Sequence, residues 1–293
     1  MLIRRIEPIL ESLTPHYELI FVNDGSKDNS WKRINELSEL YPWVMGIDLM
    51  RNYGQHNALL CGIRAARNEI IVTIDDDLQH PPEEIPKLIA KLLEGYDVVY
   101  GTPEKEQHGF WRDRASQISK LALQGSMGAK IASSASAFRA FRRDVRSAFD
   151  TYQSPYVSID VLLTWGTTRF AAIPVRHDAR QIGVSNYTFR KLVTHALNMM
   201  TGFSTLPLQL ASMIGFAFTL FGLGILAYVT GRYLIQGATV PGFAFLASII
   251  AIFSGAQLFA LGIIGEYLAR MHFRSMGQPP SVIRHVVGPN RED

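Results

Sequence analysis

The chain has 293 residues, of which 47% are hydrophobic and 19% charged, and its formal net charge is +3. This composition excludes a disordered chain, a collagen and a disulfide-rich scaffold, and so small a charge balance does not favour nucleic-acid binding. The single cysteine, Cys61, excludes an internal disulfide. Residues 192–265 carry only one formal charge, Arg232. This uneven distribution predicts a soluble domain joined to a membrane domain.

Strands and helices are predicted to alternate between Tyr17 and Tyr100. Short apolar runs predict strands over residues 19–22, 44–49, 70–74 and 98–100. Amphipathic runs between them predict helices over residues 30–40, 55–66 and 82–94. This alternation is typical of an α/β fold with a mostly parallel sheet, which binds ligands at the carboxyl ends of its strands.

An acidic run, Asp75-Asp76-Asp77, follows the third predicted strand. In extended backbone Asp75 and Asp77 point to the same side and Asp76 points elsewhere. The pair suits a divalent cation that is shared with phosphate oxygens, because Mg²⁺ prefers one or two carboxylates plus substrate phosphate. The alternative is a solvated acidic turn that caps the following helix.

Asp24 ends the first visible strand and is followed by Gly25 and Ser26. A carboxylate there is suited to accept hydrogen bonds from a nucleobase or a ribose. The alternative is a turn aspartate that bonds to the local backbone.

Two uncharged runs, residues 192–231 and 233–265, flank Arg232. Each is long enough for one membrane span of about 20 residues. Lys and Arg residues before the first run and after the second place both termini in the cytosol, and residues 1–10 lack the features of a secretory signal. Residues 187–200 read as an interfacial amphipathic helix. Residues 110–123 fit an interfacial helix or an ordinary surface helix.

Four motifs occur in a fixed order: VNDGSKDNS at 22–30, RNYGQHNALLCGI at 51–63, DDDLQHPPEEI at 75–85 and RQIGVSNY at 180–187. With the two spans and GEYLAR at 265–270, they resemble the polyisoprenyl-phosphate glycosyltransferases of glycosyltransferase family 2. That group includes bactoprenol glucosyltransferases, undecaprenyl-phosphate aminoarabinose transferases and dolichyl-phosphate mannosyltransferases. The resemblance implies an inverting transfer from a nucleotide sugar, UDP-linked, to a polyprenyl phosphate at the cytosolic face of the plasma membrane.

The resemblance also implies the architecture. It predicts a GT-A, Rossmann-like domain over residues 1–186, an interfacial helix over 187–204, two transmembrane helices over 205–268 and a cytosolic tail over 269–293. Homo-oligomers, often tetramers, are implied as well.

By the same resemblance the site residues fall into three groups. The metal, Mg²⁺ or Mn²⁺, is expected on Asp75 and Asp77. The nucleotide is expected on Asp24, Gly25, Ser26, Arg51, Gly54 and Asp75. The acceptor phosphate is expected on Arg180, Ser185, Asn186, Arg190 and Lys191, and Arg180 and Ser185 count with Asp75 and Asp77 as catalytic. An arginine fork and a serine hydroxyl suit phosphate independently of the family.

Three departures from the family stand out. Asn186 replaces a lysine of the phosphate motif, and residues 133–136 read Ser-Ser-Ala-Ser where relatives carry an aspartate proposed as a base. The family's first strand has no counterpart, because the helix predicted over 2–13 begins directly after Met1. We therefore expect a gap between two strand edges, and a late start, a truncation or a substitute strand as its origin.

Two other functions are alternatives to a polyprenyl-phosphate glycosyltransferase. A processive polysaccharide synthase would need more spans and a Gln-x-x-Arg-Trp motif, which the chain lacks. A degenerate membrane-anchored protein that binds nucleotide sugar or scaffolds a complex is favoured by the three departures.

Overall fold

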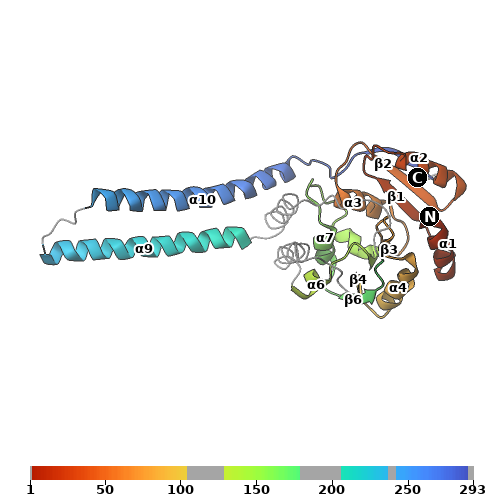
Figure 1. Cartoon of the computed structure of the whole chain (residues 1–293), viewed down its shortest axis with the longest axis horizontal. Helices are drawn as coiled ribbons and strands as arrows, with labels where there is room; N and C mark the ends of the chain where they lie inside the picture. The colour runs from red at the N-terminus through yellow and green to blue at the C-terminus, as the bar shows by residue number, and fades with distance from the viewer. Residues whose placement is uncertain (1, 104–128, 179–205, 237–241, 290–293) are drawn as a thin grey trace.

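The computed structural model describes residues 2–103, 129–178, 206–236 and 242–289. They form an α/β domain and a two-helix hairpin that extends away from it (Figure 1). The first elements are α1 (Leu2–Leu13), β1 (Leu19–Asn23), α2 (Ser30–Leu40), β2 (Val44–Leu49), α3 (Gln55–Ala65), β3 (Ile70–Thr73), η1 (Pro82–Glu84), α4 (Ile85–Leu93) and β4 (Val98–Pro103). The others are α6 (Ala129–Ser134), β5 (Arg139–Arg142), η2 (Arg143–Ala148), α7 (Ile159–Gly166), β6 (Phe170–Val175), α9 (Leu206–Gln236), α10 (Phe243–Ser275) and β7 (Ile283–Val287).

The strands form two separate mixed sheets, with the orders β1-β2-β7 and β3-β5-β4-β6. The α/β class is confirmed, but the expectation of one mostly parallel sheet needs correction. The pairs β1–β2 and β4–β6 are parallel, whereas β5 runs antiparallel to β3 and β4, and β7 runs antiparallel to β2. Among the described strands, β1 pairs only with β2 and β3 only with β5, so the division falls between β1 and β3.

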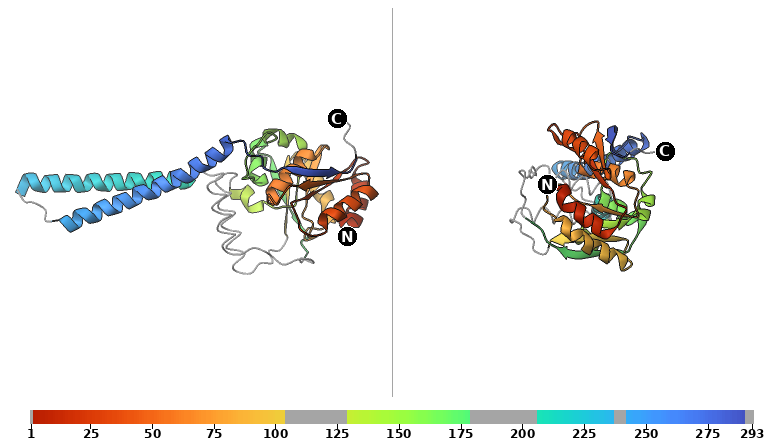
Figure 2. Two further views of the ribbon diagram at one scale, coloured as in Figure 1. Left: turned by 90° about the horizontal axis from the view of Figure 1, so that it is seen from above. Right: turned by 90° about the vertical axis from the view of Figure 1, so that its right-hand side faces the viewer.

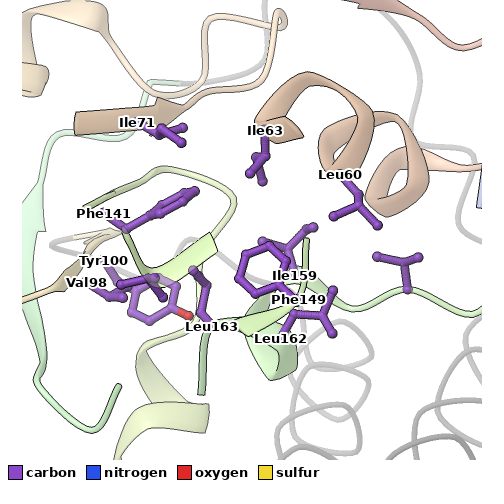
Figure 3. Close-up of a cluster of buried hydrophobic side chains, with 12 residues drawn as sticks. Leu60, Ile63, Ile71, Val98, Tyr100, Phe141, Phe149, Ile159, Leu162 and Leu163 are labelled. Carbon is purple, nitrogen blue, oxygen red and sulfur yellow. The ribbon is translucent and has the colours of Figure 1, made fainter. Parts of the chain in front are cut away.

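Helices cover both faces of the four-stranded sheet. On one face, Leu60 and Ile63 of α3 and Leu162 of α7 pack on Val98 and Phe141 (Figure 3). The opposite face meets α1 and α4. Its buried members are Ile6, Ile85, Leu88, Leu92, Val99, Phe138, Ala140 and Val175. Consecutive strand residues point to opposite faces, which explains why Val98 and Val99 belong to different clusters.

Helix α3 joins the two sheets. Its residues Ala58, Cys61 and Ala65 pack with Met45 and Ile47 of β2 in a third buried cluster. Leu60 and Ile63 of the same helix belong to the cluster on the four-stranded sheet. One helix therefore shares its apolar surface between two sheets that are not hydrogen-bonded to each other in the described structure.

The C-terminal elements differ from the predicted boundaries. Helices α9 and α10 contain two candidate membrane spans, Pro207–Ile235 and Ile252–His272. In the most apolar stretch of each span, the buried share of residues is 6% in the first and 0% in the second. Phe218 and Phe253 pack edge to face between them, with ring centroids 5.5 Å apart. Helix α10 continues to Ser275, and the segment expected to be a tail returns to the domain as β7 (Figure 2). The two predicted interfacial segments lie outside the described residues.

Candidate functional site

Asp24 ties the turn after β1 to the loop after β2. Its Oδ1 accepts the Tyr53 N–H at 2.7 Å and its Oδ2 accepts the Gly54 N–H at 2.8 Å. The two loops meet because parallel neighbouring strands end at the same edge of their sheet. The alternative of a local backbone bond is therefore wrong, whereas the ligand role of Asp24 stays a prediction. Asp24 bonds to backbone 29 and 30 residues away, and each oxygen keeps a second lone pair.

Gly25 lies in tight contact with the same loop. Its φ is +65°, and a Cβ there would sit 2.5 Å from the carbonyl carbon of Arg51 and 2.6 Å from the nitrogen of Asn52. Only glycine combines this backbone conformation with so close an approach. The turn and the loop therefore form one compact unit.

The remaining predicted nucleotide residues border this unit. The Arg51 guanidinium lies over the Tyr53 ring, 4.5 Å from its centroid. Gly54, with φ +94°, precedes α3. The N–H of Ser26 donates to Oδ1 of Asn23 at 3.4 Å. Asp24, Gly25, Ser26, Arg51 and Gly54 thus lie together, whereas Tyr53 was missed by sequence reasoning because its part is a backbone N–H.

Asp75 joins the acidic run to the same loop. The side chain of Gln55, the first residue of α3, donates from Nε2 to Asp75 Oδ1 at 2.8 Å. Gln55 was not predicted as a site residue, because nothing in its local sequence indicates a partner 20 positions away. The hydrogen bond brings the end of β3, in one sheet, to the loop that follows β2, in the other.

The backbone of the acidic run is not extended. Strand β3 ends at Thr73, residues 76 and 77 lie in a turn, and Leu78 has a φ of +58°. The prediction that extended backbone aligns Asp75 and Asp77 is therefore wrong. The Asp77 Oδ1 accepts the N–H of Gln79 at 3.1 Å. The two carboxylates still interact, because burial first and then the negative charge of Asp77 raise the pKa of Asp75.

A divalent cation fits this arrangement. Two carboxylates that repel each other, one of them with a pKa raised by burial, are stabilised when a cation neutralises them. Within the described ranges no group of three or more His, Cys, Asp or Glu side chains is placed to hold a metal. Asp75 and Asp77 alone form an incomplete shell, which suits Mg²⁺ or Mn²⁺ if a phosphate-bearing ligand supplies the other oxygens.

A buried arginine lies behind the acidic run. Arg139 on β5 is 1% exposed and forms an ion pair with Asp160 of α7, which also accepts the Tyr100 hydroxyl at 3.1 Å. The Arg139 charge opposes the rise in the pKa of Asp75. Sequence reasoning missed Arg139 because residues 138–143 contain three arginines among three apolar residues, and the sequence does not show which arginine is buried.

His80 packs next to the acidic run as a neutral ring. It is 9% exposed, stacks on Phe138 at 5.3 Å between centroids and meets His177 edge to face at 4.9 Å. Burial and the neighbouring His177 lower its pKa to about 4. The ring is therefore uncharged at neutral pH and acts as an apolar support.

The five predicted acceptor-phosphate residues, Arg180, Ser185, Asn186, Arg190 and Lys191, lie outside the described residues. The described chain stops two positions before Arg180, at Asp178, whose N–H donates to the carbonyl oxygen of Gln79 at 2.8 Å. Residue 178 is thus anchored beside the loop that carries Asp75 and Asp77.

The family model described as Glycosyl transferase family 2 matches residues 1–149, half of the chain. The chain belongs to glycosyltransferase family 2. The matched region contains the turn after β1, the loop after β2 and the acidic run, so the predicted nucleotide and metal residues lie within it, whereas the predicted acceptor-phosphate residues lie beyond it. The hairpin of α9 and α10 lies outside the match.

Solved structures of similar fold include glucosyl-3-phosphoglycerate synthase of M. tuberculosis, at 19% identity and TM-score 0.48 over 68% of this chain and 72% of that chain. The same enzyme in complex with Mn²⁺, UDP-glucose and phosphoglyceric acid matches at 18% identity and TM-score 0.48, over 68% and 71%. Mannosyl-3-phosphoglycerate synthase from Rubrobacter xylanophilus matches at 17% identity and TM-score 0.45, over 82% and 72%.

Proposed function

We propose that this family 2 glycosyltransferase moves a sugar from a UDP-sugar to a polyprenyl phosphate at the cytosolic face of the plasma membrane. The observation that carries the proposal is that one chain joins the family domain to two long, exposed apolar helices. A membrane anchor of this kind suits a substrate that lives in the bilayer. The acceptor assignment therefore rests on the hairpin.

The donor is proposed to bind across the two loops and the acidic run. Asp24, Gly25, Ser26, Arg51 and Gly54 would contact the nucleoside. Free lone pairs on Asp24 suit nucleobase or ribose donors. Arg51 is exposed. With the nucleoside bound at the turn after β1, the Arg51 guanidinium is available to the diphosphate. Asp75 would contact both the ribose and the metal.

Asp75 and Asp77 would hold the divalent cation together with diphosphate oxygens. When bound, the cation neutralises charge on the departing nucleoside diphosphate. The chain's own contribution is to hold the two carboxylates at the end of β3, where Gln55 orients Asp75 and the Gln79 N–H orients Asp77.

The transfer is proposed to be a single displacement with inversion. A phosphate oxygen of the lipid forms a bond to the anomeric carbon while the bond from that carbon to the diphosphate oxygen breaks. Arg180, Ser185, Asn186, Arg190 and Lys191 would hold the acceptor phosphate. A phosphate monoester with a second pKa near 6 is largely a dianion at pH 7, so no residue needs to remove a proton from it.

The test is incubation of the full-length protein, in membranes or nanodiscs, with labelled UDP-sugars and undecaprenyl phosphate. We expect a labelled lipid that forms with one donor and disappears with EDTA. Absence of lipid-linked product with every donor, while UDP still binds, would overturn the transferase proposal and favour the degenerate scaffold.

A matched pair of variants separates the metal site from general damage. Asp77→Asn removes one proposed ligand charge, and we expect the product to be lost. Asp144→Asn makes the same change at an exposed position of η2 and should leave the product unchanged. Equal activity of the two variants would remove Asp77 from the site.

A further inference from the structure

The loop after β2 is held at its first residue by the C-terminal strand. We name residues 50–57, which comprise the loop after β2 and the first residues of α3, the donor loop. The Met50 N–H donates to the carbonyl oxygen of Val282 at 2.9 Å, and the Met50 carbonyl oxygen accepts Nη2 of Arg284 at 2.7 Å. Arg284 lies on β7, which pairs antiparallel with β2. The first residue of the donor loop is therefore hydrogen-bonded to β7 and the residue before it, a segment that follows the two-helix hairpin in the chain.

Arg284 also reaches the base of the neighbouring turn. Its Nε lies 4.0 Å from Oδ2 of Asp48, a side chain only 6% exposed. The Oδ1 of Asp48 accepts Nδ2 of Asn23 at 2.7 Å, and Asn23 immediately precedes Asp24. One guanidinium thus contacts both the carbonyl that starts the donor loop and the carboxylate beneath the Asp24 turn.

The far end of the donor loop is held by a second segment. Asn57 Nδ2 donates to the carbonyl oxygen of Tyr53 at 2.6 Å and to that of Pro155 at 3.1 Å. His56 Nδ1 accepts the N–H of Ile159 at 3.4 Å. The segment before α7 therefore fixes the same loop that Asp24 holds at Tyr53 and Gly54.

That segment is covered by the end of α10. The Arg270 guanidinium lies over the Tyr156 ring, 4.6 Å from its centroid, and Tyr156 follows Pro155 directly. Arg270 is 8% exposed and pairs with Glu266 one turn earlier, Nη2 to Oε1 at 2.7 Å. The ion pair with Glu266 holds the guanidinium within the distance of the Tyr156 ring at which a cation–π contact is favourable.

We propose that Arg284 and Arg270 are positioning residues that hold the donor loop from its two ends, so that nucleotide affinity depends on the C-terminal end of α10 and on β7. The inference rests on the proposed function, because it assumes that this loop binds the nucleotide of the donor. Neither arginine touches the substrate. Each acts through a neighbour: Arg284 through Met50 and Asp48, Arg270 through Tyr156 and Pro155.

The effect should fall on binding rather than on chemistry. Arg51 and Asn52 are exposed, so the donor loop depends on its anchors for order. If one of these anchors is lost, part of the binding free energy of the nucleotide goes into ordering the loop, and the measured affinity falls. The acidic run follows β3 in the other sheet, and the Gln55 side chain links it to the donor loop through one hydrogen bond. We therefore expect KM for the donor to rise while kcat at saturating donor stays near the wild-type value.

The first experiment measures UDP binding, in the presence of Mn²⁺, to the full-length protein in nanodiscs. Arg284→Ala should weaken Kd about tenfold, the loss that corresponds to one charge-assisted hydrogen bond. Arg284→Lys keeps a charged donor for the Met50 carbonyl and should recover most of the affinity. Arg33→Ala removes an arginine of α2 whose ion pair, within the described part of the chain, is local and made with Glu36, and this variant should bind UDP as wild type does.

The second experiment is a double-mutant cycle with Arg270→Ala and Tyr156→Ala. Each single variant should weaken UDP binding about threefold, in line with loss of one partly desolvated cation–π contact. The double variant should be no weaker than the worse single variant, because both changes remove the same contact. Tyr156→Phe keeps the ring and should behave as wild type.

The outcomes separate the two proposals. A wild-type protein that binds no nucleotide would overturn the proposed function. Wild-type protein that binds UDP, with Arg284→Ala and Arg270→Ala binding equally well, would overturn the positioning inference alone. A drop in kcat with an unchanged KM would also overturn it. Thermal unfolding of each variant identifies any that fails to fold. For Arg284, the Lys variant then carries the test, and a folded Arg284→Lys protein that binds UDP about tenfold more weakly than wild type would count against the inference.

Discussion

Replacement of Gly25 by alanine tests whether the turn after β1 and the donor loop form one compact unit. A left-handed backbone costs an alanine about 1 kcal/mol. The added Cβ would sit 2.5 Å from the carbonyl carbon of Arg51, about 0.9 Å short of the 3.4 Å at which ordinary contact begins. The clash is with backbone and cannot be relieved by a side-chain rotation, so overpacking adds about 2 kcal/mol. The expected loss of stability is about 3 kcal/mol.

Gly277→Ala provides the matched control. Gly277 has a φ of +62°, close to that of Gly25, and a Cβ there would meet nothing within 4 Å. It should lose about 1 kcal/mol from backbone strain alone. In thermal unfolding the midpoint should fall by about 3 °C for Gly277→Ala and about 9 °C for Gly25→Ala. UDP affinity should fall only for Gly25→Ala. Equal losses in the two variants would show that the donor loop yields freely, and the compact-unit reasoning would be refuted.

Three further predictions concern the acidic run and its surroundings. Asp160→Ala leaves the Arg139 charge buried without its partner and should cost about 4 kcal/mol of stability in chemical unfolding; a loss under 1 kcal/mol would contradict it. A raised pKa means that Asp75 stabilises the fold at low pH and that this contribution is lost as pH rises through its folded-state pKa. Asp75→Asn should therefore be more stable than wild type at neutral pH and equal to it at acidic pH, as measured by thermal midpoints across pH. Exhaustive chelation should abolish product formation, and Mn²⁺ or Mg²⁺ should restore it; full activity after chelation would exclude the metal.

Local patterns predicted the elements of the family domain closely. The helix over 30–40 and the strand over 44–49 have the predicted bounds, and α3 ends one residue earlier than predicted. The helix predicted from Pro82 begins as the 3₁₀ turn η1 before it becomes α4. These elements are fixed by short-range features such as apolar periodicity and a proline in the first turn, which a sequence displays directly.

Long-range contacts were not predictable in the same way. Strand β7 has only five residues and pairs with a strand more than 230 positions earlier. Its local sequence therefore gave no reason to predict more than a tail. The partners of Asp24 are backbone N–H groups, which every residue but proline carries and which no motif marks. Arg139 and Asp160 lie 21 positions apart, and their burial depends on how β5 meets α7. The sequence located the candidate residues, whereas the contacts among them required the fold.

The separation of the strands into two sheets means that the proposed donor would also affect stability. Asp24 and the donor loop belong to the β1-β2-β7 sheet, whereas Asp75 follows β3 in the other sheet. The described links between them include the shared helix α3 and the side-chain bond from Gln55 to Asp75. A nucleotide sugar bound to both Asp24 and Asp75 would connect the two sheets. Its binding energy would stabilise the native state and bring the unfolding of the two halves into one cooperative transition.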